Sequence, residues 1–213
     1  MNYREYNREE RDICAHLFRL LLYDQPNWRP LKEFLGSTKV IDPRIYCEVA
    51  LIRDAYHFRK PNIRQFMDDL CELIARQNQI LSYTHFADLP DFIRDPSKTH
   101  PKQIRFKLKD KGLLKSVGDQ EVYGSLQAMF NAKPDLAVCN DSDLVVYEAK
   151  YTSGFETEQM KRTENIGEVW GTLLYSDLGF ESKPTVSVRT LGMESASPDI
   201  SWEKVYEIAA KHW

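Results

Sequence analysis

The chain has 213 residues, of which 42% are hydrophobic, and its 29 lysines and arginines stand against 32 aspartates and glutamates, for a formal net charge of −3. This size and hydrophobic content predict one domain, or one domain with an elaboration, and exclude disordered and collagen-like classes. The charge gives no global basic field that would recruit nucleic acid. No apolar stretch approaches the roughly 20 residues of a membrane span, and residues 1–12 lack the apolar segment of a secretory signal. We therefore expect a cytoplasmic protein that does not associate with membranes.

The spacing of apolar residues changes near residue 98, from helical to mixed. In the first part, apolar residues recur at helical spacing, and prolines mark where helices begin and end. The helices expected there cover residues 7–23, 43–57 and 62–81. We expect residues 1–97 to be a helical region packed on a core formed by residues 98–213, as one compact unit.

The second part contains segments in which the apolar period drops to two, which indicates strands. Over residues 104–109 apolar side chains alternate with cations, which predicts a half-buried strand. Further strands are expected over residues 121–130, 135–138, 144–151 and 185–191, and helices over residues 156–174 and 201–212. This order predicts a mixed β-sheet flanked by helices, an α/β (α+β) fold.

Two acids and a lysine fall at matching places on two neighbouring strands. A hairpin turn centred between Asp141 and Ser142 would place Asp135 and Glu148 directly opposite each other, with Cβ atoms about 5 Å apart. Lys150 lies two residues beyond Glu148 and therefore on the same face. Adjacent like charges need compensation, and Mg²⁺, which takes one or two carboxylates and keeps several waters, would supply it. The alternative is a surface ion pair, against which stand the nearly continuous apolar runs of both strands.

Pro-Asp, a short hairpin and Glu-x-Lys, followed by a helix and another strand, resemble the PD-(D/E)XK nuclease superfamily, which has the restriction-endonuclease-like fold. The resemblance covers residues 118–192. It implies that Asp135 and Glu148 are metal ligands, with the backbone carbonyl of Ala149 as a further ligand. It also implies that Lys150 is catalytic, that the cofactor is Mg²⁺ or Mn²⁺, and that the reaction is hydrolysis of phosphodiester bonds.

Many members of this superfamily add a carboxylate from a helix ahead of the sheet. On the helix expected over residues 43–57, Glu48 is centred on the apolar face, where a charge must be paired, neutralised or bound to metal. Glu10 lies on the apolar stripe of the first helix, but a capping box with Asn7 offers a structural explanation. We therefore expect Glu48 as a third metal ligand, with a structural ion pair as the alternative for either acid.

The helix expected over residues 156–174 carries further candidates. Some branches of the superfamily have glutamine followed four residues later by tyrosine, whereas here Gln159 is followed by Thr163, which leaves the branch open. Lys161 and Arg162 could contact the substrate backbone, with ordinary helix-surface charge as the alternative.

The small net charge hides a basic segment. Residues 98–115 contain seven lysines and arginines and one aspartate, a local charge of +6. On the expected strand, Arg105, Lys107 and Lys109 fall on one side, and such a stripe is suited to a phosphate backbone. The alternative is an edge strand whose lysines block aggregation. The place of this segment, just before the sheet that holds the motif, favours nucleic-acid binding.

Together these patterns predict a metal-dependent nuclease with a nucleic acid substrate, DNA rather than RNA. The resemblance to the superfamily, many of whose members act in restriction or phage defence, implies such a role here. The alternative is a catalytically inactive nucleic-acid-binding or assembly protein that keeps the fold, and a third hypothesis is a hydrolase of another phosphate compound. The sequence has no Gly-rich phosphate loop and no His-Glu-x-x-His motif, so it does not support a nucleotide-driven motor protein or a zinc protease. A homodimer or a partner subunit is left open.

Overall fold

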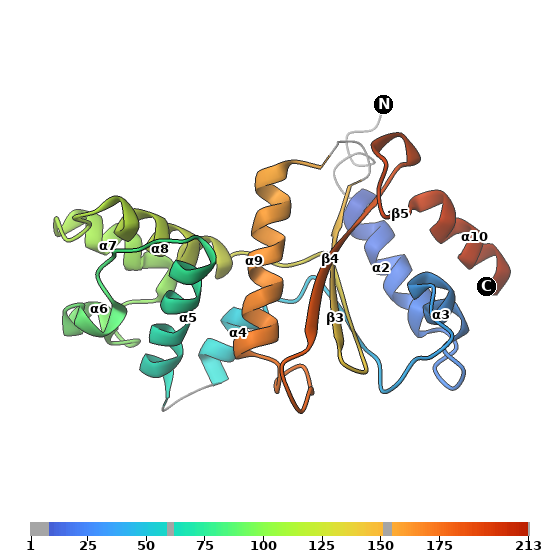
Figure 1. The fold of residues 1–213 in the computed structure, drawn as a ribbon, viewed down its shortest axis with the longest axis horizontal. Helices are drawn as coiled ribbons and strands as arrows, with labels where there is room; N and C mark the ends of the chain where they lie inside the picture. The colour runs from blue at the N-terminus through green and yellow to red at the C-terminus, as the bar shows by residue number, and fades with distance from the viewer. Residues whose placement is uncertain (1–8, 59–61, 151–154, 213) are drawn as a thin grey trace.

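The computed structural model describes residues 9–58, 62–150 and 155–212. Within these ranges, nine α-helices accompany one open, five-stranded mixed sheet, so the expected mixed α/β class is confirmed (Figure 1). In the same part of the chain, every helix is too short or too polar to cross a membrane.

The sheet has the strand order β1–β2–β3–β4–β5. Its strands are β1 (Arg44–Cys47), β2 (Leu136–Asn140), β3 (Asp143–Ala149), β4 (Thr185–Gly192) and β5 (Ile200–Ser201). The first three pair antiparallel, while β4 joins β3 in parallel and β5 joins β4 in parallel. A parallel pair needs a crossover between its strands, and a helix supplies it between β3 and β4.

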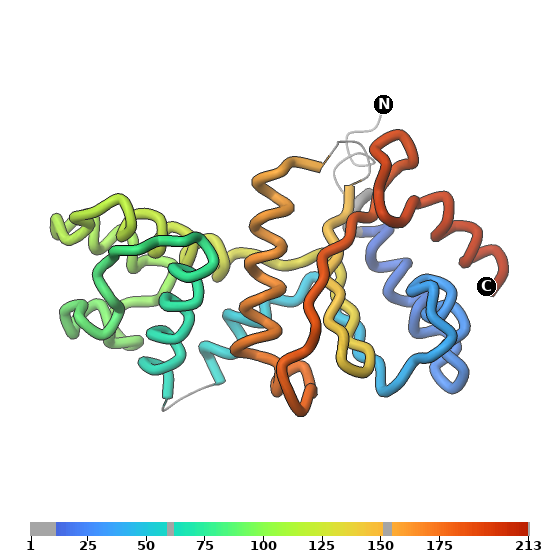
Figure 2. The backbone as a smooth tube through the Cα atoms, viewed as in Figure 1, coloured from blue at the N-terminus to red at the C-terminus, as the bar shows by residue number. Residues whose placement is uncertain are grey.

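Helices cover both faces of this sheet. They are α2 (Glu9–Leu22), α3 (Arg29–Leu35), α4 (Leu51–Phe58), α5 (Ile63–Gln77), α6 (Asp91–Arg94), α7 (Pro101–Asp110), α8 (Val117–Met129), α9 (Thr157–Leu173) and α10 (Trp202–His212). On one face lie α2, α3 and α10. On the other face α9 packs directly on the sheet, and α5 to α8 extend away from it (Figures 1 and 2).

Alternate side chains of β2 and β3 enter two hydrophobic clusters, because successive side chains of a strand point to opposite faces. The cluster with α2, α3 and α10 takes Leu136, Val138, Val145 and Tyr147. The cluster with α5, α8 and α9 takes Ala137, Cys139, Leu144 and Val146. This double burial explains why both strands are nearly continuous apolar runs.

A buried carboxylate fixes the start of α8. Ser116 accepts a hydrogen bond from the Asp119 backbone N–H at 3.0 Å, and Asp119 accepts one from the Ser116 N–H at 3.0 Å, which completes a capping box. Asp119 also accepts from the Thr84 N–H at 2.6 Å. Burial alone would raise the pKa of Asp119, but the hydrogen bonds from Thr84 and Ser116 outweigh it and lower the pKa.

Four expected helices and three expected strands are confirmed. The helices expected over residues 7–23, 62–81, 156–174 and 201–212 correspond to α2, α5, α9 and α10, and the strands over 135–138, 144–151 and 185–191 correspond to β2, β3 and β4. Two details of these expectations, the capping residue Asn7 and the strand end at residue 151, lie outside the described residues.

Three expected elements are wrong. Residues 43–57 are not one helix, because Arg44–Cys47 pair with β2 as the strand β1 and α4 follows only from Leu51. Residues 101–110 form α7 instead of a strand, with Pro101 in its first turn and the His100 side chain accepting from the Lys102 N–H. In place of the strand expected over residues 121–130, residues 121–129 belong to α8 and Phe130 caps that helix.

Candidate active site

The hairpin predicted around Asp141 and Ser142 is confirmed, with the predicted register. Leu136 pairs with Tyr147, so the same register continued by one residue places Asp135 opposite Glu148. The Asp135 carboxylate is fixed there because its Oδ2 accepts a hydrogen bond from the Ala149 backbone N–H at 2.8 Å. The two acids therefore occupy neighbouring places on the face of the sheet that α9 covers.

Glu148 is the buried acid of the pair, with 8% of its surface exposed. Two side chains of α9 donate to it. The Thr163 hydroxyl donates to Oε2 at 2.9 Å, and the Gln159 amide donates to Oε1. Lys150 Nζ lies 3.7 Å from the same Oε1. A buried charge needs such partners, and these donors fix the direction of the carboxylate.

The α9 helix can reach Glu148 because it packs unusually close to the sheet. Gln159 and Thr163 are four residues apart and therefore share one face of the helix. Further along α9, a Cβ added at Gly167 would lie 3.0 Å from Val186 on β4, and one added at Gly171 only 2.5 Å from it. The glycines thus permit the short helix-to-sheet distance that brings both donors to the acid.

Two hydrogen bonds, one with β4 and one with α10, fix the backbone of Lys150. Its N–H donates to the Leu191 carbonyl at 2.8 Å, which continues the pairing with β4, and its carbonyl accepts from the indole N–H of the fully buried Trp202 at 2.8 Å. The main chain is therefore fixed from β4 and α10, while the ammonium group reaches Glu148 on the opposite face.

Glu48 lies on no helix, contrary to the prediction, but between β1 and α4, with a left-handed φ of 50°. Its N–H donates to the Asp135 carbonyl at 3.3 Å, and the register of β1 with β2 places it opposite Asp135. Glu48, Asp135 and Glu148 therefore follow one another across three strands. Within residues 9–58, 62–150 and 155–212, however, no three His, Cys, Asp or Glu side chains come together as metal ligands, so Glu48 does not complete a three-acid set.

The electrostatic potential around Glu48 and Asp135 is negative. The thiol of Cys47 lies at the end of β1, and its burial, together with the negative charges of Glu48 and Asp135, raises its pKa. The local field at the Asp135 end of β2 therefore favours a cation.

Glu10, the other helix-borne candidate, lies in the first turn of α2, and its side chain is outside the described part of the molecule.

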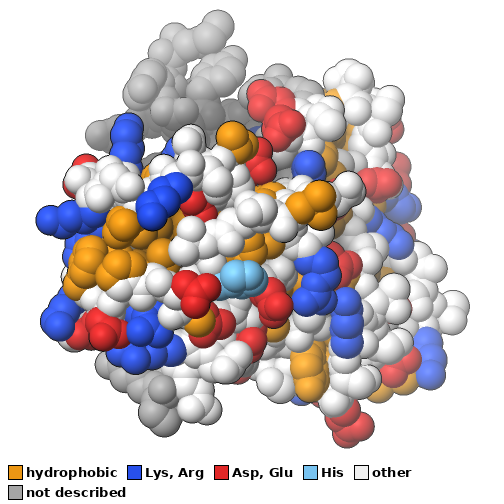
Figure 3. Space-filling view, turned by 60° about the vertical axis from the view of Figure 1, so that its left-hand side comes forward, with side chains coloured by type: hydrophobic (Ala, Val, Ile, Leu, Met, Phe, Trp, Pro, Cys, Tyr) orange, Lys and Arg blue, Asp and Glu red, His pale blue; other side chains and the backbone are white. Residues whose placement is uncertain are grey.

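The predicted basic stripe is wrong because residues 101–110 are helical. Arg105 and Lys109 are exposed, but Lys107 points elsewhere, and its ammonium donates to the Lys98 carbonyl at 2.5 Å and to the Thr99 hydroxyl at 2.8 Å. Figure 3 brings the helices α5 to α8 forward and shows lysine and arginine side chains in separate groups with acidic side chains between them. Lys107 therefore has a structural contact, and the three cations do not lie on one side of a strand.

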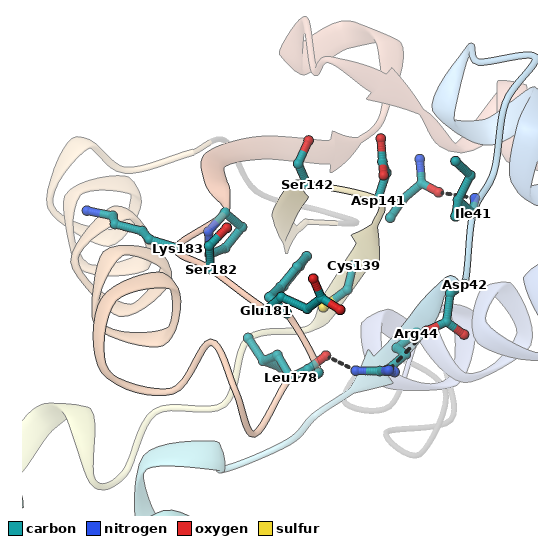
Figure 4. A pocket seen from close by; sticks show the side chains of 14 residues that line it. Ile41, Asp42, Arg44, Cys139, Asp141, Ser142, Leu178, Glu181, Ser182 and Lys183 are labelled. Atoms are coloured by element: carbon teal, nitrogen blue, oxygen red, sulfur yellow. Dashed lines mark hydrogen bonds and ion pairs between the residues drawn. The ribbon is translucent and has the colours of Figure 1, made fainter.

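A polar cleft of about 320 Å³ lies at the opposite end of the sheet, beside the turn of the hairpin (Figure 4). Arg44 spans it, donating to the Leu178 carbonyl and to Asp42. Gly179 is required beneath this arginine, because its φ is +80° and a Cβ there would overlap the guanidinium. None of the residues predicted for the site lines this cleft, so it is separate from the Asp135 end of the sheet.

No protein-family model, curated protein or solved structure matches the chain. The resemblance to the PD-(D/E)XK superfamily therefore rests on the motif and on the order of elements that surround it. At the level of fold, the structure supports the coarser statement, a mixed α/β protein with an open five-stranded sheet.

Proposed function

We propose that the protein is a metal-dependent nuclease that hydrolyses phosphodiester bonds, in DNA rather than RNA, with Asp135, Glu148 and Lys150 as its catalytic site. The observation that carries the proposal is the meeting of these residues on one face of the sheet, with Lys150 Nζ 3.7 Å from Glu148 Oε1. The hairpin, helix and strand that follow Asp135 have the order on which the superfamily resemblance was based. That resemblance also suggests restriction or phage defence as the biological setting.

The donor set fits Mg²⁺ or Mn²⁺. Both ions prefer oxygen ligands, and Mg²⁺ typically binds through one or two carboxylates while the substrate phosphate and water complete its shell. Asp135 and Glu148 would hold the ion, and Glu48 extends the row of acids beside them. When bound, such an ion lowers the pKa of water and stabilises the charge that develops on the phosphate.

The neighbouring groups orient the two carboxylates and compensate their charge. Gln159 and Thr163 hold the Glu148 carboxylate, and the Ala149 N–H holds that of Asp135, so neither acid has to reorganise when substrate arrives. The Lys150 ammonium lies beside Glu148, where it can neutralise charge growing on a phosphate or orient the attacking water. Each residue thus has a role that its contacts permit.

One observation favours a second candidate, a catalytically inactive nucleic-acid-binding or assembly protein. Lys150, Gln159 and Thr163 can compensate Glu148 without a metal ion, and an ion pair with donors on both oxygens is a stable arrangement by itself. In that case the three residues would stabilise the sheet and perform no chemistry.

Cleavage assays separate the two candidates. Purified protein is incubated with linear, circular and single-stranded DNA and with RNA, in Mg²⁺, Mn²⁺ or EDTA. We expect metal-dependent cleavage that EDTA abolishes, and a loss of about 100-fold or more in each of Asp135→Asn, Glu148→Gln and Lys150→Met.

The matched control is Glu181→Gln, which removes an acid from the cleft at the other end of the sheet and should cleave like the wild type. Unchanged cleavage in the three site variants would refute the assignment of the site. Binding of nucleic acid with no cleavage under any metal condition would support the inactive candidate.

A further inference from the structure

A second polar cleft, of about 270 Å³, lies between α8 and α9. Its charged lining residues are Glu158, Lys161 and Arg162, all on α9. On the α8 side three of the four lining residues, Gly124, Ser125 and Ala128, are small, and Met129 at the end of the helix is the fourth. The α9 side carries the charged residues, so the two walls differ in character.

Two cations line this cleft and a third lies beside it. Lys161 and Arg162 line it from α9, and both are exposed. Arg105, on α7, is not one of the lining residues but lies beside Gly124, which is: its guanidinium carbon is 3.8 Å from where a Cβ on Gly124 would be.

In the described part of the chain, none of these three cations has an ion pair, whereas Lys98, Lys183 and Lys204 each pair with a nearby acid. Only one acid, Glu158, is among the residues that line the cleft. Three cations against one acid leave a local excess of positive charge that the protein itself does not compensate, and such a place favours an anionic ligand.

The cleft and the two acids are separated by the width of α9. Its α9 residues, 158, 161, 162 and 165, alternate along the helix with Gln159 and Thr163, which bind Glu148. At 100° per residue the centres of the two sets lie about 130° apart, a little over a third of a turn, on a helix that is roughly 10 Å wide with its side chains. A ligand in the cleft would therefore lie on a different face of α9 from the side that contacts Glu148, about one helix width away.

We propose that this cleft binds the phosphate backbone of a single nucleic acid strand beside the bond to be cleaved, with Lys161, Arg162 and Arg105 as the phosphate contacts. The inference rests on the proposed nuclease function and adds the form of the substrate. The volume of the cleft is close to the lower limit of small-molecule sites, which suits about one nucleotide and is too small to enclose a duplex. Sequence preference is not expected, because cations on phosphates carry no base information.

The test is the salt dependence of binding to labelled single-stranded DNA and RNA oligonucleotides in EDTA, where cleavage does not occur. Each lost phosphate contact lowers the slope of log K against log salt by about 0.7 for single strands. We expect a decrease of about 1.4 for the double variant Lys161→Ala/Arg162→Ala and about 0.7 for Arg105→Ala. Ser125→Glu, which places an acid in the cleft, should weaken binding, whereas Ser125→Gln should weaken it much less.

Lys183→Ala/Lys204→Ala is the matched control, because it removes the same charge from surfaces outside the cleft. If the cleft variants and this control share one affinity and one slope, the inference is wrong, and stronger binding of duplex than of single strands would overturn its choice of substrate. Cleavage that depends on Glu148, combined with cleft variants that bind like the control, would refute the cleft alone. Binding that depends on the cleft, with no cleavage in any metal, would refute the nuclease and leave the cleft assigned.

Discussion

At the scale of single residues, the hydroxyl of Thr163 connects α9 with Glu148. It is 4% exposed and donates to Oε2 at 2.9 Å, while Gln159, one turn earlier, donates to the other oxygen. A carboxylate with a donor on each oxygen has few other orientations available, so these two residues position the acid. Gln159 and Thr163 would therefore affect cleavage only by orienting Glu148.

The substitution Thr163→Val removes this hydroxyl and keeps the size of the side chain. Because the acid loses a donor, we expect metal-dependent cleavage to fall by about 10- to 100-fold and the free energy of unfolding to fall by about 1–3 kcal/mol. Thr163→Ser restores the donor and should recover most of the activity. Cleavage rates and urea unfolding measure the two effects, and full activity in Thr163→Val would show that the contact does not position Glu148.

The juxtaposition of Asp135 and Glu148 could be predicted because a short hairpin fixes its own register. The role of Thr163 was missed, although its spacing of four residues from Gln159 signalled a shared helix face. The contact from Trp202 to the Lys150 carbonyl had no signal in the sequence, since it joins residues far apart along the chain.

At the scale of elements, α7 shows that a helix can carry the alternating sequence pattern that is typical of a strand. Over residues 104–109 apolar and charged side chains alternate, but only Ile104 and Leu108, four apart, are buried, while Phe106 is 58% exposed. The helical period was therefore present within the alternation, and Pro101 marked the start of the helix. The pair Ser116 and Asp119 likewise signalled the start of α8.

Two glycines of α8 provide a test of its packing. A Cβ at Gly118 would lie 2.0 Å from the Ser82 carbonyl oxygen, whereas one at Gly124 would come no closer than 3.8 Å to Arg105. We expect Gly118→Ala to lower the free energy of unfolding by about 1–3 kcal/mol through overpacking. Gly124→Ala should raise it by about 0.5–1 kcal/mol, because alanine favours a helix interior. Urea unfolding followed by circular dichroism measures both, and changes of the same sign would contradict this packing.

At the scale of the whole molecule, the acids converge because distant segments join one sheet. β1 pairs with β2 across roughly 90 residues of sequence and places Glu48 beside Asp135, and β4 fixes the main chain at Lys150 (Figures 1 and 2). Local patterns predicted the hairpin and the α9 to β4 crossover. They did not predict β1, because a four-residue edge strand depends on a partner that lies far away in the sequence.

The most direct test of the central claim is thermal unfolding with and without Mn²⁺, which requires no substrate. An ion held by Asp135 and Glu148 binds the folded sheet and not the unfolded chain, so Mn²⁺ at 100 times its Kd should stabilise the protein by about 2.7 kcal/mol. For a chain of this length that corresponds to a Tm increase of about 5–10 °C. We expect this increase in the wild type and in Glu181→Gln, and its loss in Asp135→Asn and Glu148→Gln. No increase in the wild type, or an equal increase in all four proteins, would contradict the metal site.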